Sequence, residues 1–177
     1  LGYAELAPFW GAAIRFVAAA IILLGVVAAW RLPLPRGRAL TGVLVYGILN
    51  FGLFYMFSYW ALTEVTAGTG MVVLAIVPLL TLLLATAQNV ERFTLRGLVG
   101  AVIAASGIAV VFGDTIGTVS VGSLMALLGS ALCAAQVPIV VKKYPPVDPV
   151  VENALGMAVG GAVLLALSLA AGEPRSF

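Results

Sequence analysis

Long apolar runs alternate with short polar connections along the whole chain of 177 residues. Most of the runs reach the length of about 20 residues that an α-helix needs to cross the apolar core of a bilayer. The runs and their connections leave no room for a soluble domain of ordinary size. The pattern predicts an all-α polytopic membrane protein with six transmembrane helices, at Pro8–Trp30, Leu40–Leu62, Val65–Gln88, Leu98–Gly113, Val119–Val141 and Val150–Ala171.

The charged residues divide the connections into two kinds. Seven of the nine lysines and arginines lie in alternate connections, and the connections between these carry only Glu64 or Asp114. Short cytoplasmic loops of membrane proteins are enriched in lysine and arginine. We therefore expect a multi-pass protein of the cytoplasmic membrane, with cytoplasmic loops at Arg31–Arg38, Glu91–Arg96 and Lys142–Asp148.

The same alternation gives the first helix a direction. The arginines follow this run, so the helix is expected to enter from the non-cytoplasmic side. Glu5 and Pro8 stand where a signal peptide would carry a basic leader. We therefore expect at least one helix before Leu1, and the short outer tail that ends at Phe177 suggests truncation at that end as well.

Composition narrows the function classes. Hydrophobic residues make up 63% of the chain and charged residues 9%, whereas soluble domains carry about 25% charged residues. The net charge of +2 is explained by topology, so the expected surroundings are the lipid bilayer and no nucleic acid. The chain has no histidine and a single cysteine, Cys133, so we expect no metal site, no cofactor and no catalytic residues.

Arg15 is the sharpest candidate for a functional residue. It lies about two turns into the first run, where a cation is costly unless it faces a cavity or a partner. Such residues commonly mark a substrate pathway. The alternative is that the side chain extends to the outer headgroups or ties helices together.

The second run carries a face that mixes polar and aromatic side chains. Tyr46, Asn50, Phe54 and Phe57 follow each other at helical spacing. An amide among aromatic rings suits a small amphipathic solute. The alternative is that Asn50 bonds to a neighbouring helix while the rings fill the core.

Other polar residues in the runs carry less weight. Gln136 is a further pathway candidate, because an amide in lipid needs a partner. Serines and threonines, such as Thr81, Thr86 and Ser130, are expected mainly to bond to their own helix. Pro78 and Pro138 are expected to kink their helices, which marks a cavity or a moving element in some transporters.

Small residues favour close helix packing in two runs. Gly156 and Gly160 form a GxxxG pair, and Gly100 with Ala104 has the same spacing. Such ridges let helix backbones approach each other in lipid. At the start of the last run, Asp148 and Pro149 are expected to form the N-cap and the first helical position.

Several stretches resemble the EamA domain of the drug/metabolite transporter superfamily. They are PFWGAAIRFVAAAIILL from Pro8, FSYWALTEVTAGTGMVVLAIVPLLTLLLA from Phe57, ERFTLRGLVGAVIAASGIAVVFGD from Glu91 and GSLMALLGSALCAAQVPIVVKK from Gly122. Arg15 matches a recurrent arginine of the family and Pro78 a recurrent proline. Val90 departs from the glycine that the family usually has before the glutamate.

The resemblance implies a ten-helix bundle of two inverted five-helix repeats. In it, residues 1–117 would be most of the first repeat, equivalent to helices two to five, and residues 118–177 the start of the second, equivalent to helices six and seven. The family implies a secondary transporter, often an exporter, of small metabolites such as amino acids, working by alternating access. No embedded carboxylate supports proton coupling within these helices.

Two readings from other classes stay open. The chain could be a non-transporting membrane scaffold or sensor subunit, which predicts no water-accessible cavity along the second run. It could also be a channel-like oligomer that completes its pore between chains. For a transporter of this kind, a homodimer is a possible assembly.

Overall fold

The computed structural model describes residues 8–112 and 120–172, and every regular element in these ranges is a helix. Four helical segments in these ranges are long and apolar enough to cross a bilayer: Phe9–Ala29, Arg38–Leu62, Val121–Lys143 and Pro149–Ala171. They coincide with the first, second, fifth and sixth predicted runs. The all-α character is thus confirmed for the described residues, and their four candidate spans, against the six predicted, are consistent with a polytopic membrane protein.

The helices form two compact units. Unit 1 comprises the residues up to Met56 and those from Lys143 onward, and unit 2 comprises Phe57–Lys142. This division follows contacts in space. The proposed repeats, residues 1–117 and 118–177, follow the sequence and stay a prediction.

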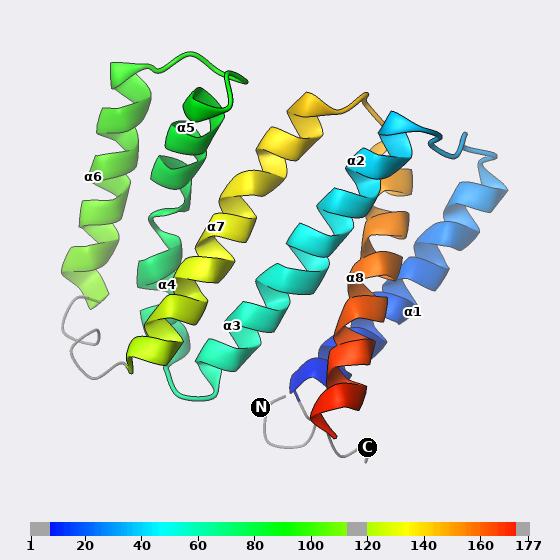
Figure 1. Ribbon diagram of the computed structural model, residues 1–177, viewed down its shortest axis with the longest axis horizontal. Helices are drawn as coiled ribbons and strands as arrows, with labels where there is room; N and C mark the ends of the chain where they lie inside the picture. Colours follow the sequence, from blue (N-terminus) through cyan, green and yellow to red (C-terminus); the bar gives the residue numbers. More distant parts are fainter. Residues whose placement is uncertain (1–7, 113–119, 173–177) are drawn as a thin grey trace. The chain divides into compact units, whose positions relative to one another are not determined.

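Unit 1 is organised around one helix from the end of the chain. Its elements are α1 (Pro8–Ala29), α2 (Arg38–Gly47), the π-helix η1 (Ile48–Leu53), the start of α3 (Phe54–Leu62) and α8 (Pro149–Ala171). The last of these, α8, packs against α1, α2 and η1 (Figure 1). Val27 of α1 and Val151 and Ala154 of α8 form a buried apolar cluster at one end of the α1–α8 contact.

Local signals place the ends of these helices. Asp148 caps α8 as predicted, since its carboxylate accepts a hydrogen bond from the Val150 amide at 2.8 Å and Pro149 follows it. The connection between α1 and α2 is not helical, as its prolines predict. Gly37 ends it with a φ of 57°, a backbone conformation that glycine adopts without strain.

Unit 2 contains the rest of α3 with α4 (Ala67–Leu74), α5 (Val77–Ala87), α6 (Leu95–Phe112) and α7 (Val121–Lys143). Ala61, Val73 and Leu127, from α3, α4 and α7, meet in a buried core. Both α4 and α5 pack against α6. Within this unit, α7 therefore contributes to the core, and α6 packs on α4 and α5.

The single helix predicted over Val65–Gln88 is wrong, because this run forms α4 and α5. The helix stops after Leu74, and Pro78 lies in the first turn of α5. Proline has no amide hydrogen, so Pro78 cannot donate to the carbonyl four residues earlier. Just before it, the Ile76 amide donates to the Val73 carbonyl at 3.2 Å, and this bond between residues three apart is that of a 3₁₀ turn. The proline breaks this segment rather than bending it.

Candidate functional site

Three polar side chains form a chain of hydrogen bonds inside unit 1. The Tyr46 hydroxyl donates to the Asn153 carbonyl oxygen at 3.0 Å, and the Asn50 amide donates to the Tyr46 oxygen at 3.2 Å. The Asn153 amide in turn donates to the backbone carbonyl of Pro149 at 2.8 Å. Tyr46 is only 8% exposed. Because a lone polar group is costly in such surroundings, these bonds fix the orientation of all three side chains.

The helix that carries Tyr46 and Asn50 changes its winding at this network. Residues Ile48–Leu53 form a π-helix, whose hydrogen bonds join residues five apart. This winding places Phe51 beside Tyr46, with ring centroids 5.8 Å apart and an interplanar angle of 79°. Single-turn π segments often occur at functional sites.

Aromatic rings continue the site toward α1. Phe16 packs edge-on against Phe51, with centroids 5.2 Å apart, and against Tyr55, at 4.7 Å. Phe54 lies at 5.2 Å from Tyr55 in the same edge-on manner. The predicted candidate Phe54 is therefore part of an aromatic cluster that joins α1 to the second span.

Glycines let α8 come close to the second span. A Cβ atom on Gly160 would lie 2.2 Å from the Phe51 Cβ, and one on Gly156 would lie 2.9 Å from the Tyr46 ring. A Cβ on Gly47 would meet the Gly156 carbonyl oxygen at 2.7 Å. Real Cβ atoms do not approach this closely, so the helix contact depends on glycine at each of these positions.

The structure does not join Arg15 to this network. Its side chain is exposed on α1, and within residues 8–112 and 120–172 it makes no hydrogen bond or ion pair. Phe16, its neighbour, nevertheless packs on Phe51 and Tyr55. Arg15 therefore lies at the level of the aromatic cluster, with its guanidinium available to a ligand, a lipid or another segment.

Gln136 belongs to unit 2, where it pairs with Gln88. The Gln88 amide donates to the Gln136 oxygen at 2.8 Å, and the Gln136 amide donates back at 3.2 Å. Each amide thus satisfies the other. As predicted, Thr81, Thr86 and Ser130 bond to carbonyls of their own helices.

The remaining predicted positions have plainer surroundings. A Cβ on Gly100 would meet nothing within 4 Å, and the side chain of Ala104 lies outside the described side chains. Pro138 lies inside α7, which runs as one helix from Val121 to Lys143. The packing role of Gly100 with Ala104 and the kink at Pro138 stay predictions.

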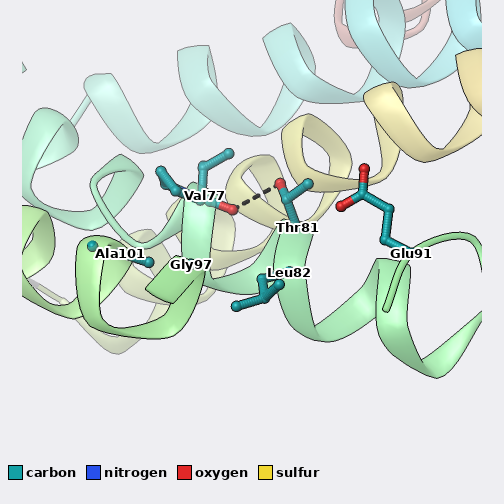
Figure 2. A pocket seen from close by; sticks show the side chains of 8 residues that line it. Val77, Thr81, Leu82, Glu91, Gly97 and Ala101 are labelled. Atoms are coloured by element: carbon teal, nitrogen blue, oxygen red, sulfur yellow. Dashed lines mark hydrogen bonds between the residues drawn. The ribbon is translucent and has the colours of Figure 1, made fainter. Parts of the chain in front are cut away.

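Unit 2 contains a pocket of about 490 Å³ between α5 and α6 (Figure 2). Apolar and glycine residues make up most of its wall, with the Thr81 hydroxyl on one side and the Glu91 carboxylate from the α5–α6 loop. The lining residues are Val77, Pro78, Thr81, Leu82, Glu91, Gly97, Gly100 and Ala101.

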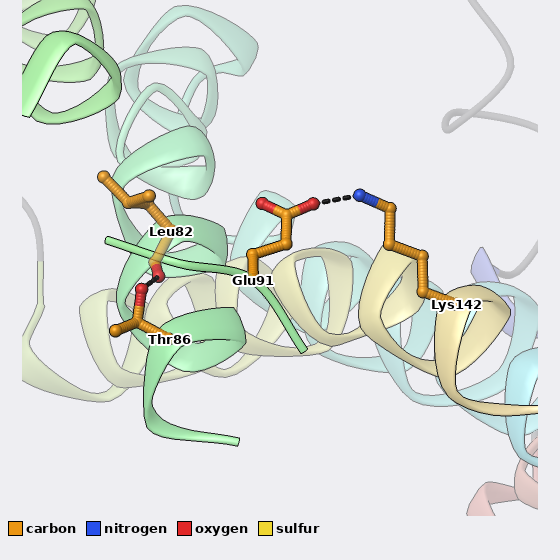
Figure 3. Close-up of polar contacts among 4 residues, drawn as sticks. All are labelled: Leu82, Thr86, Glu91 and Lys142. Atoms are coloured by element: carbon orange, nitrogen blue, oxygen red, sulfur yellow. Dashed lines mark hydrogen bonds and ion pairs between the residues drawn. The ribbon is translucent and has the colours of Figure 1, made fainter. Parts of the chain in front are cut away.

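Two carboxylates tie loops of unit 2 to the ends of α7. Glu91 forms an ion pair with Lys142 near the end of the helix (Figure 3). Glu64 accepts hydrogen bonds from the hydroxyls of Ser120 and Ser123 at the start. These bonds stabilise the ionised form and hold the pKa of Glu64 below its usual value.

Several of these residues were missed by the sequence prediction. Asn153 was recognisable as an amide inside an apolar run, one turn after the Asp148 cap. Phe51 looked like any other core ring, since nothing in the sequence reveals the π-helix. The pairing of Glu91 with Lys142 had a weak signal, namely opposite charges in two loops predicted on the same side of the membrane.

Comparison with known proteins identifies the chain's relatives at the family level. The model of the EamA-like transporter family matches residues 1–113, which is most of the chain. No curated protein and no solved structure matches. The family consists of transporters rather than enzymes, and its EamA domain is that of the drug/metabolite transporter superfamily. With its apolar spans, the chain is a multi-pass membrane protein that belongs to the EamA-like transporter family.

Proposed function

We propose that this chain contributes the solute pathway of a secondary transporter that exports small organic metabolites, such as amino acids, across the cytoplasmic membrane. The observation that carries the proposal is the network of Tyr46, Asn50 and Asn153 in a member of a transporter family. Two of its members project from a span that changes to a π-helix beside aromatic rings.

The Asn50 carbonyl oxygen and the Arg15 guanidinium suit a zwitterionic solute, which carries an ammonium and a carboxylate. The Asn50 amide uses one hydrogen to bond Tyr46, and its carbonyl oxygen has no partner among the described residues. That oxygen can accept a hydrogen bond from an ammonium group. Arg15 has five donors for a carboxylate. Phe54 and its neighbours offer apolar contact to the rest of the solute.

Gln136 is the pathway candidate of unit 2, and its bonds to Gln88 would have to open for a solute to use them. Two amides that already bond each other can exchange a partner at little net cost, because each broken bond is replaced. Alternating access would bring such an exchange about during the transport cycle.

The wider architecture is part of the proposal. It places the six apolar runs in the membrane as part of a ten-helix bundle of two inverted repeats. The loops at Arg31–Arg38, Glu91–Arg96 and Lys142–Asp148 would then face the cytoplasm, as their basic residues favour. The working assembly would be one transporter chain or a homodimer in the lipid bilayer.

Export from cells that express the complete protein tests this function. Cells are loaded with labelled amino acids, and the rate of release is compared between the parent, Arg15→Gln and Asn50→Leu. We expect each replacement to lower the rate about tenfold or more, because each removes a charged or polar contact with the solute. Arg36→Gln, in the loop before α2, is the matched control and should leave the rate unchanged.

Release that is equal in all four proteins at equal amounts in the membrane would refute the assignment of these residues. Release that never depends on the protein would refute transport of these solutes. Access of water-soluble thiol reagents to single cysteines along Tyr46–Phe57, in a variant without Cys133, reports separately on whether the face lines a water-filled path.

A further inference from the structure

The pocket between α5 and α6 has no part in the solute pathway proposed above. Its walls are mostly apolar, and on α6 it is lined by the small residues Gly97, Gly100 and Ala101. A Cβ on Gly100 would meet nothing within 4 Å, whereas one on Gly97 would lie 2.8 Å from the Thr94 hydroxyl oxygen and 3.6 Å from Leu82. Its volume of about 490 Å³ lies within the range of small-molecule sites.

The polar side chains that the structure describes in this lining, Thr81 and Glu91, both accept hydrogen bonds. The Thr81 hydroxyl gives its hydrogen to the Val77 carbonyl at 2.9 Å, so only its oxygen lone pairs remain (Figure 2). Glu91 is an acceptor with two oxygens. One binds Lys142, and the other has no partner in the part of the chain that the structure describes (Figure 3). A ligand that fits must therefore bring donors.

The charge of the pocket selects the kind of donor. Among the described residues that line the pocket, only Glu91 carries a charge. Lys142 approaches that carboxylate from α7 and does not line the pocket. An ammonium group bonds to a carboxylate more strongly than a neutral amine or alcohol does. A phosphate would be repelled by the same carboxylate, which disfavours a phospholipid headgroup.

The ion pair that already occupies Glu91 is easily exchanged. The Lys142 and Glu91 side chains are 56% and 41% exposed. Exposed ion pairs contribute little to stability, because water and salt screen them. An incoming ammonium can thus bind the free carboxylate oxygen or replace Lys142.

We propose that the α5–α6 pocket is a binding site for a small amphipathic amine, whose ammonium binds Glu91 and whose apolar body lies along Thr81, Leu82 and Gly100. The site shares no residue with the network of unit 1. Its occupation links the α5–α6 loop to the end of α7 through the ligand or through Lys142, which compete for one carboxylate.

Binding of 2-phenylethylamine to the complete protein in phosphatidylcholine nanodiscs tests this proposal. We expect saturable binding by calorimetry, and little binding of 3-phenylpropanamide, a neutral compound of similar shape. Glu91→Gln should weaken binding of the amine about tenfold or more, since it removes a charge-assisted bond. Gly100→Leu should abolish it by filling the pocket, whereas Gly107→Leu, on open surface of the same helix, should not.

The lysine gives a test in the opposite direction. Lys142→Met removes the competitor for Glu91 and should strengthen binding about twofold to fivefold, the equivalent of an exposed ion pair. Lys143→Met is its control and should have no effect. A merely misfolded variant would not bind more tightly.

Equal affinity for the amine and the amide, or for the parent and Glu91→Gln, would overturn the proposal. Nanodiscs that contain phosphatidylethanolamine distinguish the source of the ammonium. If the amine binds in a Glu91-dependent manner in phosphatidylcholine discs but no longer binds in these discs, the lipid headgroup occupies the site. That result would overturn the proposal that a free solute is the occupant. Binding is measured without transport, so the result is independent of the function proposed for unit 1.

Discussion

The two units of the molecule use the same kinds of residue for different purposes. In unit 1, glycines bring helices into contact, since Gly160 and Gly156 leave no space for a Cβ beside Phe51 and Tyr46. In unit 2, Gly100 lies at the edge of open space and helps to form a pocket. A glycine in a membrane helix therefore marks either a close helix contact or an empty space beside the helix. The spacing of glycines along the sequence does not tell which of the two is present.

Polar side chains differ between the units in a similar way. Tyr46, Asn50 and Asn153 bond within the helical part of unit 1, where the bonds orient a buried ring. In unit 2, Glu64 and Glu91 tie loops to the two ends of α7. The partly buried network of unit 1 should matter more for stability than the exposed bonds of unit 2.

The largest effect is expected from filling the contact at Gly160. Gly160→Leu places a side chain where Phe51 already lies, and overpacking of this severity should lower the free energy of unfolding by about 3 kcal/mol or more. Thermal unfolding of the purified protein in detergent measures the loss. Gly100→Leu, with an equal increase in volume, should unfold close to the parent. Equal losses for both variants would contradict the distinction between contact and vacancy.

Breaking the network in unit 1 should have the next largest effect. Asn153→Leu leaves the buried Tyr46 hydroxyl without its acceptor, at a cost of about 1–2 kcal/mol. Tyr46→Phe removes the hydroxyl itself, so the double variant should be less destabilised than the sum of the two single variants. Strict additivity in chemical unfolding would show that the two side chains do not act as a pair.

The ion pair of unit 2 should contribute less. Lys142→Met is expected to change the free energy of unfolding by no more than about 1 kcal/mol, because both partners are exposed. The difference from the parent should shrink as salt is raised, since ions screen such pairs. A loss as large as that of Asn153→Leu, or one that salt does not change, would place this pair among the structural bonds of the core.

Much of the fold could be predicted from the sequence, because helices in lipid must be long and apolar. The four spans, the Asp148 cap and the break of helix between α1 and α2 all rest on local signals. The division of Val65–Gln88 into α4 and α5 was not predicted, although Pro78 was recognised. A proline either bends or ends a helix, and the packing of the two halves decides which occurs.

The site was less predictable for a physical reason. Tyr46 and Asn50 carry a local signal, but their partner Asn153 is 107 positions from Tyr46 in the sequence. Such a pair depends on which helices pack together. The π-helix adds a second difficulty, because the composition of Ile48–Leu53 is ordinary and does not reveal it. In the π-helix, Phe51 as well as Asn50 lies beside Tyr46.

The smallest expected effect is the pH dependence that Glu64 gives to unit 2. Its pKa is lowered in the folded chain by hydrogen bonds from Ser120 and Ser123. The resulting stability is present above the pKa of an unfolded glutamate, about 4.3, and is lost as the pH falls through the lower folded value. Glu64→Gln should therefore unfold at a slightly lower temperature than the parent near neutral pH, and the two should converge in acid. A difference that stays constant from neutral pH into acid would mean that the ionised carboxylate is not what the two serines stabilise.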